Sequence, residues 1–407
     1  MSASSSLLRP RWEPPPTGAP MNARPSLSGS RWSQRTPDES FDTIDALRAH
    51  VHDRRARAEV HRVPLAALRP VEAAHGVDLS LDGAPLRPTA WAARRYSAEV
   101  GLPAQAVQAL SPRLATMALA ERRAVTHATD PDREVEVVIE HRADRPSLLR
   151  SLVSRGYART WDADLVDALL VPLAARGWQP ARANAPGGER AALFASDRDL
   201  FCFLVHEDAP LELDEVHPRP LRRGLLLRNS EVPGTALRVQ TFWFDSWCTN
   251  HMIFGAREVL DLREVHRSGD GGPLARLLEQ WADWGGFARL DAPPVQAAEI
   301  ARAAAATPLV PLRGPTEDVV EDAIERTRSL ARRARATTAL RVPLLRAGAR
   351  LALERYRRPG AEALTLWSMA GGLTEAAQQR TTYTDDRHRI DAAVGRVLEL
   401  AYRRAVA

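Results

Sequence analysis

The sequence predicts an α+β fold, in which an antiparallel sheet with flanking helices is followed by an all-helical C-terminal part. Three runs rich in β-branched, leucine and aromatic residues, 200–205, 221–227 and 237–244, follow one another, with proline, glycine and acidic residues between them. This pattern is typical of consecutive antiparallel strands. From residue 273 to the end of the chain, apolar residues recur at helical spacing. Helical segments also precede the strands, and this arrangement indicates the α+β class.

The segments before the three strands can be assigned in order. A helix is expected to start near Asp38, because apolar residues recur along one face of the following turns. Thr89 is expected to cap a helix that ends near residue 100. Glutamate alternates with valine and isoleucine over residues 134–140, which predicts a half-buried strand with one acidic, solvated face. Asp162 is expected to cap the next helix.

The domain organisation is predicted to have three parts. A chain of 407 residues exceeds the size at which a single core stops growing, so more than one unit is expected. Residues 1–37 contain a triple proline and many serines, a composition that cannot repay the entropy of folding, and they are expected to form a disordered tail. Residues 38–272 are expected to form the α+β body and residues 273–407 a basic helical region, with Thr316 and Thr384 as N-caps.

The composition limits the classes of function. All 56 basic residues are arginine, and the net charge of +5 permits a polyanionic partner. Two cysteines are too few for a disulfide framework or a multi-cysteine zinc site. No apolar run approaches the roughly 20 residues of a membrane-spanning helix, and no signal peptide is recognisable. We therefore expect a cytoplasmic protein without a membrane partner.

The search for catalytic and metal-binding patterns assigns no residue. Cys248 and His251 have a C-x-x-H spacing, but no second ligand pair lies nearby, so no metal site is predicted. Ser230 does not stand in a G-x-S-x-G elbow. A phosphate-binding loop of the usual form needs a lysine, and the chain has none. No cofactor is expected, and the sequence leans away from an enzyme.

A dense polar and aromatic motif spans the last two predicted strands and the segment after them. It reads RNSEV at 228–232, FWF at 242–244 and WCTNHM at 247–252. Asn229, Ser230, Glu231 and Asn250 are predicted to lie close together at the ends of adjacent strands. Their side chains would then satisfy a strand-to-loop junction or line one cleft, and we favour the structural role.

The runs GLLLRNSEV, ALRVQTFWFDSWCTNHMI and REVHRSG resemble the phage- and plasmid-related bacterial family catalogued as domain of unknown function number 932. The likeness extends over most of residues 60–400. The residues that match the family motif are Asn229, Ser230, Glu231, Cys248, Thr249, Asn250 and His266. Pro233 before Gly234, Asp245 in place of a common arginine and His251 in place of a glycine depart from it. The resemblance implies a mobile-element context and no particular reaction.

The most basic stretch of the chain runs from Arg326 to Arg358. It contains eleven arginines and one acid, a formal charge twice that of the whole chain. The arginines expected to contact nucleic-acid phosphates are Arg326, Arg328, Arg332, Arg333, Arg335, Arg346 and Arg350. The alternative is a solvated helix face paired with acids elsewhere, such as Glu134, Glu136 and Glu140.

Three functions remain open at this point. The first is a non-catalytic protein that binds DNA or RNA, single strands among them, because arginine clusters and aromatic side chains beside a sheet are what such proteins use. The second is a structural or assembly protein that forms a homo-oligomer. The third is an enzyme with Glu231, Cys248, Asn250 and His251 or His266 in one pocket.

Overall fold

The structure of the chain is a computed structural model. It describes residues 38–406 except for the segments 75, 144, 155, 186–187, 212–220, 246–249, 253–259, 270, 291–294, 358–359 and 381–383. The tail expected at residues 1–37, together with Cys248 and Thr249, lies outside the described residues. Within them the predicted α+β class is confirmed, with helices, antiparallel and mixed sheets and a helical C-terminal region.

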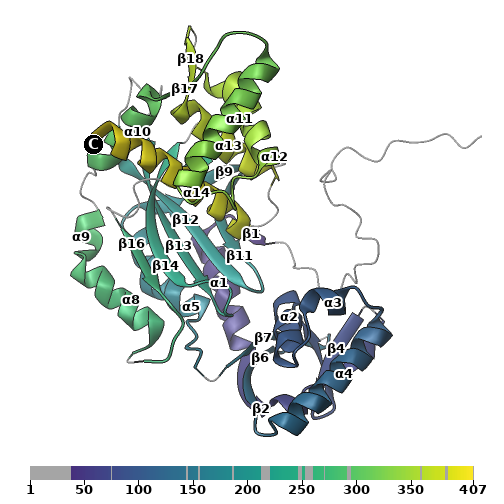
Figure 1. Cartoon of the computed structure of the whole chain (residues 1–407). Helices are drawn as coiled ribbons and strands as arrows, with labels where there is room; N and C mark the ends of the chain where they lie inside the picture. Colours follow the sequence, from purple (N-terminus) through teal and green to yellow (C-terminus); the bar gives the residue numbers. More distant parts are fainter. Residues whose placement is uncertain are drawn as a thin grey trace, which may run out of the picture.

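A large antiparallel sheet occupies the middle of the molecule (Figure 1). Its main path runs β1–β11–β12–β13–β14–β15, while β8 pairs with β12 and β16 with β14. The strands are β1 (Glu39–Phe41), β8 (Trp178–Pro180), β11 (Leu193–Ala195), β12 (Asp199–Leu211), β13 (Leu221–Ser230), β14 (Leu237–Asp245), β15 (Asn250–Met252) and β16 (Asp261–Glu264). The three strands predicted from the sequence are thus β12, β13 and β14. A short hairpin of β9 (Arg182–Ala185) and β10 (Gly188–Ala191) stands beside the sheet path.

Helices cover one face of this sheet, and they come from segments both before and after its central strands in the sequence. They are α1 (Ile44–Ala56), α5 (Asp162–Leu165), η3 (Val166–Leu170), α6 (Val171–Ala174), α8 (Gly272–Asp283) and α9 (Gly286–Leu290). Leu47, Leu169 and Leu277 pack there against Leu225 and other strand residues. Helices α8 and α9 therefore belong to the core of the sheet, although the sequence assigned nearly all of them to the C-terminal region.

The first helix begins later than the sequence suggests. The segment after Asp38 forms the edge strand β1, paired with β11. Thr43 is the N-cap of α1, and its hydroxyl accepts a hydrogen bond from the Ala46 amide at 3.1 Å. The apolar spacing correctly predicted a helix with Leu47 and Val51 buried. Phe41, the first apolar residue of that spacing, belongs to the strand β1 instead.

The opposite face of the large sheet buries aromatic side chains. Phe201 and Phe203 of β12 pack with Phe242 of β14. The alternate β12 residues, Cys202 and Leu204, face the helix-covered side. A Cβ on Gly224, which pairs with Phe242 across the strands, would lie 2.4 Å from the phenyl ring. Phe242 is 1 % exposed, so this aromatic of the predicted motif is a core residue.

A second, mixed sheet has a core of its own. Its order is β2–β6–β7–β5–β4–β3, and only the β5–β7 pair is parallel. The elements are β2 (Ala58–Pro64), η2 (Leu65–Ala67), β3 (Arg69–Ala73), β4 (Gly76–Leu81), β5 (Ala84–Pro88), α2 (Ala90–Glu99), α3 (Ala104–Gln108), α4 (Pro112–Thr129), β6 (Glu134–Glu140) and β7 (Ser147–Val153). Thr89 caps α2 as predicted, accepting from the Ala92 amide at 3.1 Å. The range 38–272, expected as one body, thus contains two sheets with separate cores.

The remaining chain forms a helical region with a third core. Its elements are α10 (Val295–Ala306), β17 (Pro308–Pro311), α11 (Thr316–Arg333), α12 (Val342–Leu351), η4 (Ala352–Tyr356), β18 (Ala363–Thr365), α13 (Leu366–Arg380) and α14 (Thr384–Val406). The antiparallel pair β17–β18 interrupts the helices, a feature that helical periodicity cannot reveal. Gly372 of α13 lies against the Gly348 backbone of α12, where a Cβ would be 2.1 Å from the carbonyl oxygen. None of the described helices is both long and apolar enough to cross a membrane.

Candidate functional site

The predicted residues at the end of β13 are buried at the place where the two sheets meet. Asn229 and Ser230 are fully buried, and Glu231 is 2 % exposed. Around them lie Arg54 from α1, Arg150 from β7 and Asp162 from α5, which are equally buried. The name central network is given to five of these residues, Asn229, Glu231, Arg54, Arg150 and Asp162.

The amide of Asn229 holds the start of α5 against the sheet. Its Nδ2 donates to the Thr160 carbonyl at 2.9 Å and to Asp162 Oδ1 at 2.7 Å. The other carboxylate oxygen of Asp162 receives Arg54 Nη2 at 2.5 Å. Asp162 was expected to cap a helix, but Trp161 is the N-cap and the Asp162 carboxylate serves the network instead.

Glu231 contacts three other members of the central network, Asp162, Arg150 and Arg54. Its Oε1 accepts from the Asp162 amide at 2.9 Å, and its Oε2 lies 2.6 Å from Arg150 Nη2 and 3.7 Å from Arg54 Nη2. Burial alone would raise the pKa of Glu231, but Arg150 and Arg54 outweigh it and hold the pKa well below its usual range. Burial and the Glu231 charge raise the pKa of Asp162. Glu231 is therefore a carboxylate, and a weak base.

The acidic face of β6 joins this junction and is less solvated than its alternation predicts, since Glu134 and Glu136 are half-buried and Glu140 is buried. Glu140 is 6 % exposed and lies 3.3 Å from Arg57 and 3.6 Å from Arg150. Glu136 receives Arg159 at 2.8 Å. Arginines from the neighbouring segments cover these carboxylates, because charged groups that leave water need partners.

Ser230 and His266 take structural positions beside the network. The Ser230 hydroxyl donates to backbone carbonyls, at 2.5 Å to Val232 and 2.7 Å to Arg198. The Tyr157 hydroxyl donates to the Ser230 carbonyl at 3.0 Å, and the Tyr157 ring stacks on His266 with centroids 5.1 Å apart. Burial lowers the pKa of His266 to about 4, so the imidazole is neutral at pH 7.

Asn250 is not part of this cluster, and the prediction that placed it there is wrong. It pairs with Asp245 in β15, and Asp245 in turn pairs with Leu221 at the start of β13. Leu221 and Ser230 are the two ends of the ten-residue strand β13, which corresponds to a separation of about 30 Å. The reason is topological: the sequence motif follows β14 back along the sheet, so its second half lies at the opposite end. Among the described residues, no three histidine, cysteine or carboxylate side chains gather as metal ligands, and burial raises the pKa of the Cys202 thiol.

The arginines predicted to contact phosphates lie mainly on two antiparallel helices, α11 and α12. Three glutamates of α11, spaced four residues apart, face them. Glu317 accepts from Arg350 at 3.0 and 3.1 Å, Glu321 from Arg346 at 2.5 Å, and Glu325 lies 3.5 Å from Arg328 and 3.6 Å from Arg332. Four of the seven predicted arginines are thus paired, with acids of α11 and not with those of β6. We call these seven arginines the helix-pair patch.

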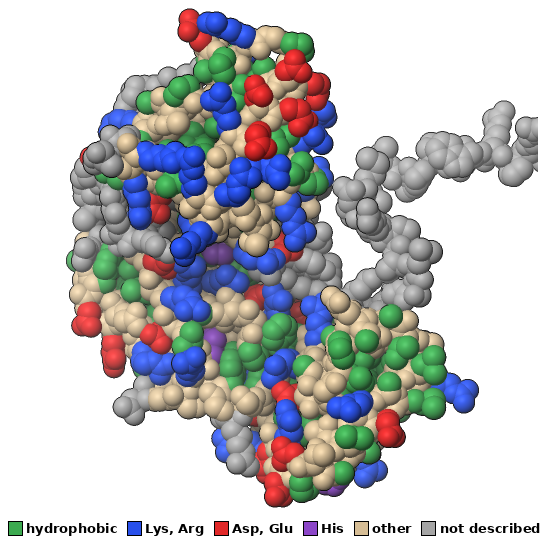
Figure 2. Space-filling view, in the orientation of Figure 1, with side chains coloured by type: hydrophobic (Ala, Val, Ile, Leu, Met, Phe, Trp, Pro, Cys, Tyr) green, Lys and Arg blue, Asp and Glu red, His purple; other side chains and the backbone are tan. Residues whose placement is uncertain are grey.

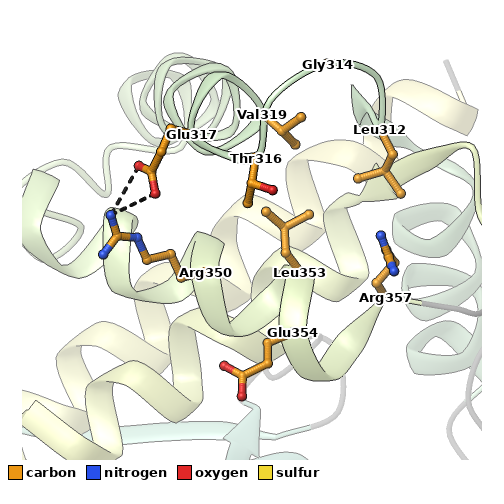
Figure 3. A pocket seen from close by; sticks show the side chains of 9 residues that line it. All are labelled: Leu312, Gly314, Thr316, Glu317, Val319, Arg350, Leu353, Glu354 and Arg357. Carbon is orange, nitrogen blue, oxygen red and sulfur yellow. Dashed lines mark hydrogen bonds and ion pairs between the residues drawn. The ribbon is translucent and has the colours of Figure 1, made fainter.

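Figure 3 shows one end of this patch. The Arg350–Glu317 pair closes one side of a pocket of about 380 Å³. Leu312, Val319 and Leu353 supply its apolar lining. The remaining predicted arginines, Arg326, Arg333 and Arg335, are exposed and make no ion pair with any residue in the described ranges.

A cleft of about 680 Å³ lies between the two sheets, on the other side of Arg54 from the central network. We call it the inter-sheet cleft. Its walls come from β1, α1, the start of α2, the segment after β6, and the turn after β11. The charged residues that line it are Glu39, Arg54, Arg57, Arg87, Glu140, Arg142, Arg145 and Asp197. Basic side chains gather along the boundary of the two sheet lobes in Figure 2.

The charges of this cleft are unevenly compensated. Arg54 and Arg57 neutralise acids, since Arg54 binds Asp162 and Arg57 lies 3.0 Å from Asp53. Arg142 and Arg145 make no hydrogen bond or ion pair within the described part of the chain. The Nε of Arg54 is buried without a hydrogen-bond partner there. Burial and Arg54 lower the pKa of His50, which also lines the cleft.

The sequence held one signal for the central network that the motif search missed. Arg150 stands in the apolar run SLLRSLV, where an arginine inside a buried strand indicates a buried acidic partner. The cleft gave no such signal, because Arg87, Arg142 and Arg145 are scattered over separate segments.

Comparisons with protein-family models, curated proteins and solved structures give no match to this chain. The resemblance of the central motif to the phage- and plasmid-related family therefore stays a prediction.

Proposed function

We propose that this chain is a non-catalytic nucleic-acid-binding protein, and that the inter-sheet cleft holds the phosphates. The observation that carries the proposal is the set of five arginines around the cleft, two of which have no acidic partner in the described ranges. Arginine presents a planar, permanently charged fork that matches phosphate oxygens. Phosphate contacts of this kind supply most of the affinity of sequence-independent binding.

The first turn of α2 adds to the attraction for anions. Thr89 and Ala90 line the cleft. The Thr89 hydroxyl accepts from the Ala92 amide, while the Ala90 and Trp91 amides have no acceptor within the helix. These amides and the helix dipole favour a negative charge at this point. Arg87 stands directly before this turn, with its side chain 43 % exposed and 3.9 Å from Asp78.

The dimensions of the cleft favour a single strand over a duplex. Pockets of about 300–1,000 Å³ hold compact ligands, and the cleft volume of about 680 Å³ falls within this range. It therefore accommodates one or two nucleotides of an unpaired strand. The buried rings of Phe201, Phe203 and Phe242 are not available for base stacking, so binding in the cleft rests on charge and carries little sequence preference.

The proposal is tested by titrating the full chain with labelled single-stranded DNA, double-stranded DNA and RNA at several salt concentrations. The cleft variant replaces Arg87, Arg142 and Arg145 with glutamine. The matched control replaces Arg328, Arg332 and Arg346 of the helix-pair patch with glutamine. We expect the cleft variant to lose affinity and salt dependence and the control to retain most of both. Absence of binding at low salt, or a cleft variant equal to the wild type, would overturn the proposal.

A role in phage or plasmid DNA metabolism and a cytoplasmic location belong to the same proposal. The first rests on the resemblance of the central motif alone. The second rests on the low number of cysteines, two in the chain, which is typical of proteins in a reducing compartment.

A further inference from the structure

Helix α4 presents apolar side chains to the outside of the second sheet. Leu114, Met117 and Val125 are 53 %, 59 % and 39 % exposed. The inner side of the same helix buries Ala115 and Leu119 against the strands. Figure 2 shows hydrophobic side chains gathered on this lobe. Scattered exposed apolar residues are normal, but a row of them along one helix is typical of an interaction surface.

The charges on the outer side of α4 are placed symmetrically. Arg113 lies four residues before Met117, and Glu121 lies four residues after it. Both side chains are exposed, and neither makes an ion pair or hydrogen bond with another described residue. Eight residues of helix separate them by about 12 Å, too far for them to pair with each other.

A twofold axis through Met117 would pair these charges between two copies of the chain. In an antiparallel contact centred on Met117, Arg113 of each copy lies level with Glu121 of the other. Such an isologous interface needs a self-complementary surface, and an exposed methionine with a cation four residues before it and an anion four residues after it is self-complementary. A partner of a different kind would not need this symmetry.

We propose that α4 is the homodimer surface of this protein, with two α4 helices packed antiparallel about Met117. The contact is small, because specific interfaces bury roughly 1,200–2,000 Å² in total and one pair of helices supplies less. The dimer is therefore weak and concentration-dependent. Residues of α4 do not line the inter-sheet cleft, so this proposal and the proposed function stand or fail separately.

The test measures the mass of the full chain by sedimentation over protein concentrations from micromolar to near-millimolar. We expect the wild type to pass from monomer to dimer. Arg113→Glu alone and Glu121→Arg alone place like charges opposite each other and should each abolish the dimer. The double variant Arg113→Glu/Glu121→Arg restores the pairing with reversed signs and should restore the dimer.

Two further variants keep the result interpretable. Met117→Asp should abolish the dimer at unchanged thermal stability, because Met117 is exposed in the monomer. The control Arg346→Glu lies in the helical region and should dimerise like the wild type. A wild type that stays monomeric, single reversals that leave the dimer intact, or a double reversal that fails to restore it would each overturn the proposal.

Discussion

The helix-pair patch and the inter-sheet cleft both carry several arginines, but their acids lie in different places. On α11 and α12 the partners Glu317, Glu321 and Glu325 are exposed and come from the patch's own helix pair. At the sheet junction the carboxyl groups of Glu231 and Asp162 are buried behind the cleft and contact Arg150 and Arg54. Arg142 and Arg145 on the outer wall make no ion pair within the described ranges, and on the helix pair the same holds for Arg326, Arg333 and Arg335. The comparison teaches that the density of arginine in a sequence does not measure the positive charge available to a partner.

The largest difference between the two regions should appear in stability. Glu231→Ala leaves Arg54 and Arg150 buried without their shared carboxylate, and breaking a buried pair in this way costs about 3–5 kcal/mol. Glu321→Ala removes an exposed pair with Arg346, for which a change below about 1 kcal/mol is expected. Urea unfolding of both variants measures the two free energies. Equal losses of unfolding free energy in Glu231→Ala and Glu321→Ala would contradict the expectation that the buried ion pair contributes more than the exposed one.

Acid should destabilise the protein through Glu231. Its pKa is lowered in the folded state, so its contribution to stability is complete above the unfolded value of about 4.3 and is lost as the pH falls through the lower folded value. The free energy of unfolding of the wild type should therefore fall more steeply below about pH 4 than that of Glu231→Gln. A Glu321→Gln control should follow the wild type, and parallel curves for all three proteins would contradict the assignment.

Nucleic-acid binding should separate the regions by salt dependence. Each phosphate contact on a single strand contributes about 0.7 to the slope of log affinity against log salt concentration. The cleft variant at Arg87, Arg142 and Arg145 should lower that slope by about 2 in total. The control variant at Arg328, Arg332 and Arg346 should change it by less than one contact, because all three are paired with glutamates of α11. Anisotropy titrations decide between the regions, and the reverse order would locate binding on the helix pair.

The smallest expected effect concerns Arg335. Its φ of 52° is left-handed, and it follows the end of α11, where the Ala336 amide donates to Ala331 and the Arg335 amide to Arg332. Glycine is the preferred residue at such a helix end. Arg335→Gly should therefore stabilise the chain by about 0.5 kcal/mol, which thermal unfolding can detect, and leave binding unchanged. A loss of affinity would give Arg335 a role in the ligand site.

The local elements were predictable because their signals lie within a few residues. Runs of leucine, β-branched and aromatic residues bounded by proline, glycine and acidic residues located β12, β13 and β14, and the threonine side chain located the start of α2. The acids Glu317 and Asp318 stand in the first turn of α11, as helix rules suggest, but its N-cap is Pro315 and not the predicted Thr316. The same rules erred where a distant segment competes. Asp162 reads as a cap in sequence, but Asn229 and Arg54 bind its carboxylate, and the first helix gives up its initial turn to an edge strand paired with β11.

The sequence by itself determined the α+β class, the three central strands β12, β13 and β14, the cap of α2 and the overall excess of arginine. Only the tertiary structure decided which charges meet. Arg54, Arg150, Asp162 and Glu231 come from four separate segments, and periodicity reports that a residue is buried without naming its partner. It was also the antiparallel path of β14 that carried Asn250 to the far end of the sheet from Asn229. Ion pairs form wherever the fold brings opposite charges together, so the charge left for a ligand is a property of the assembled surface.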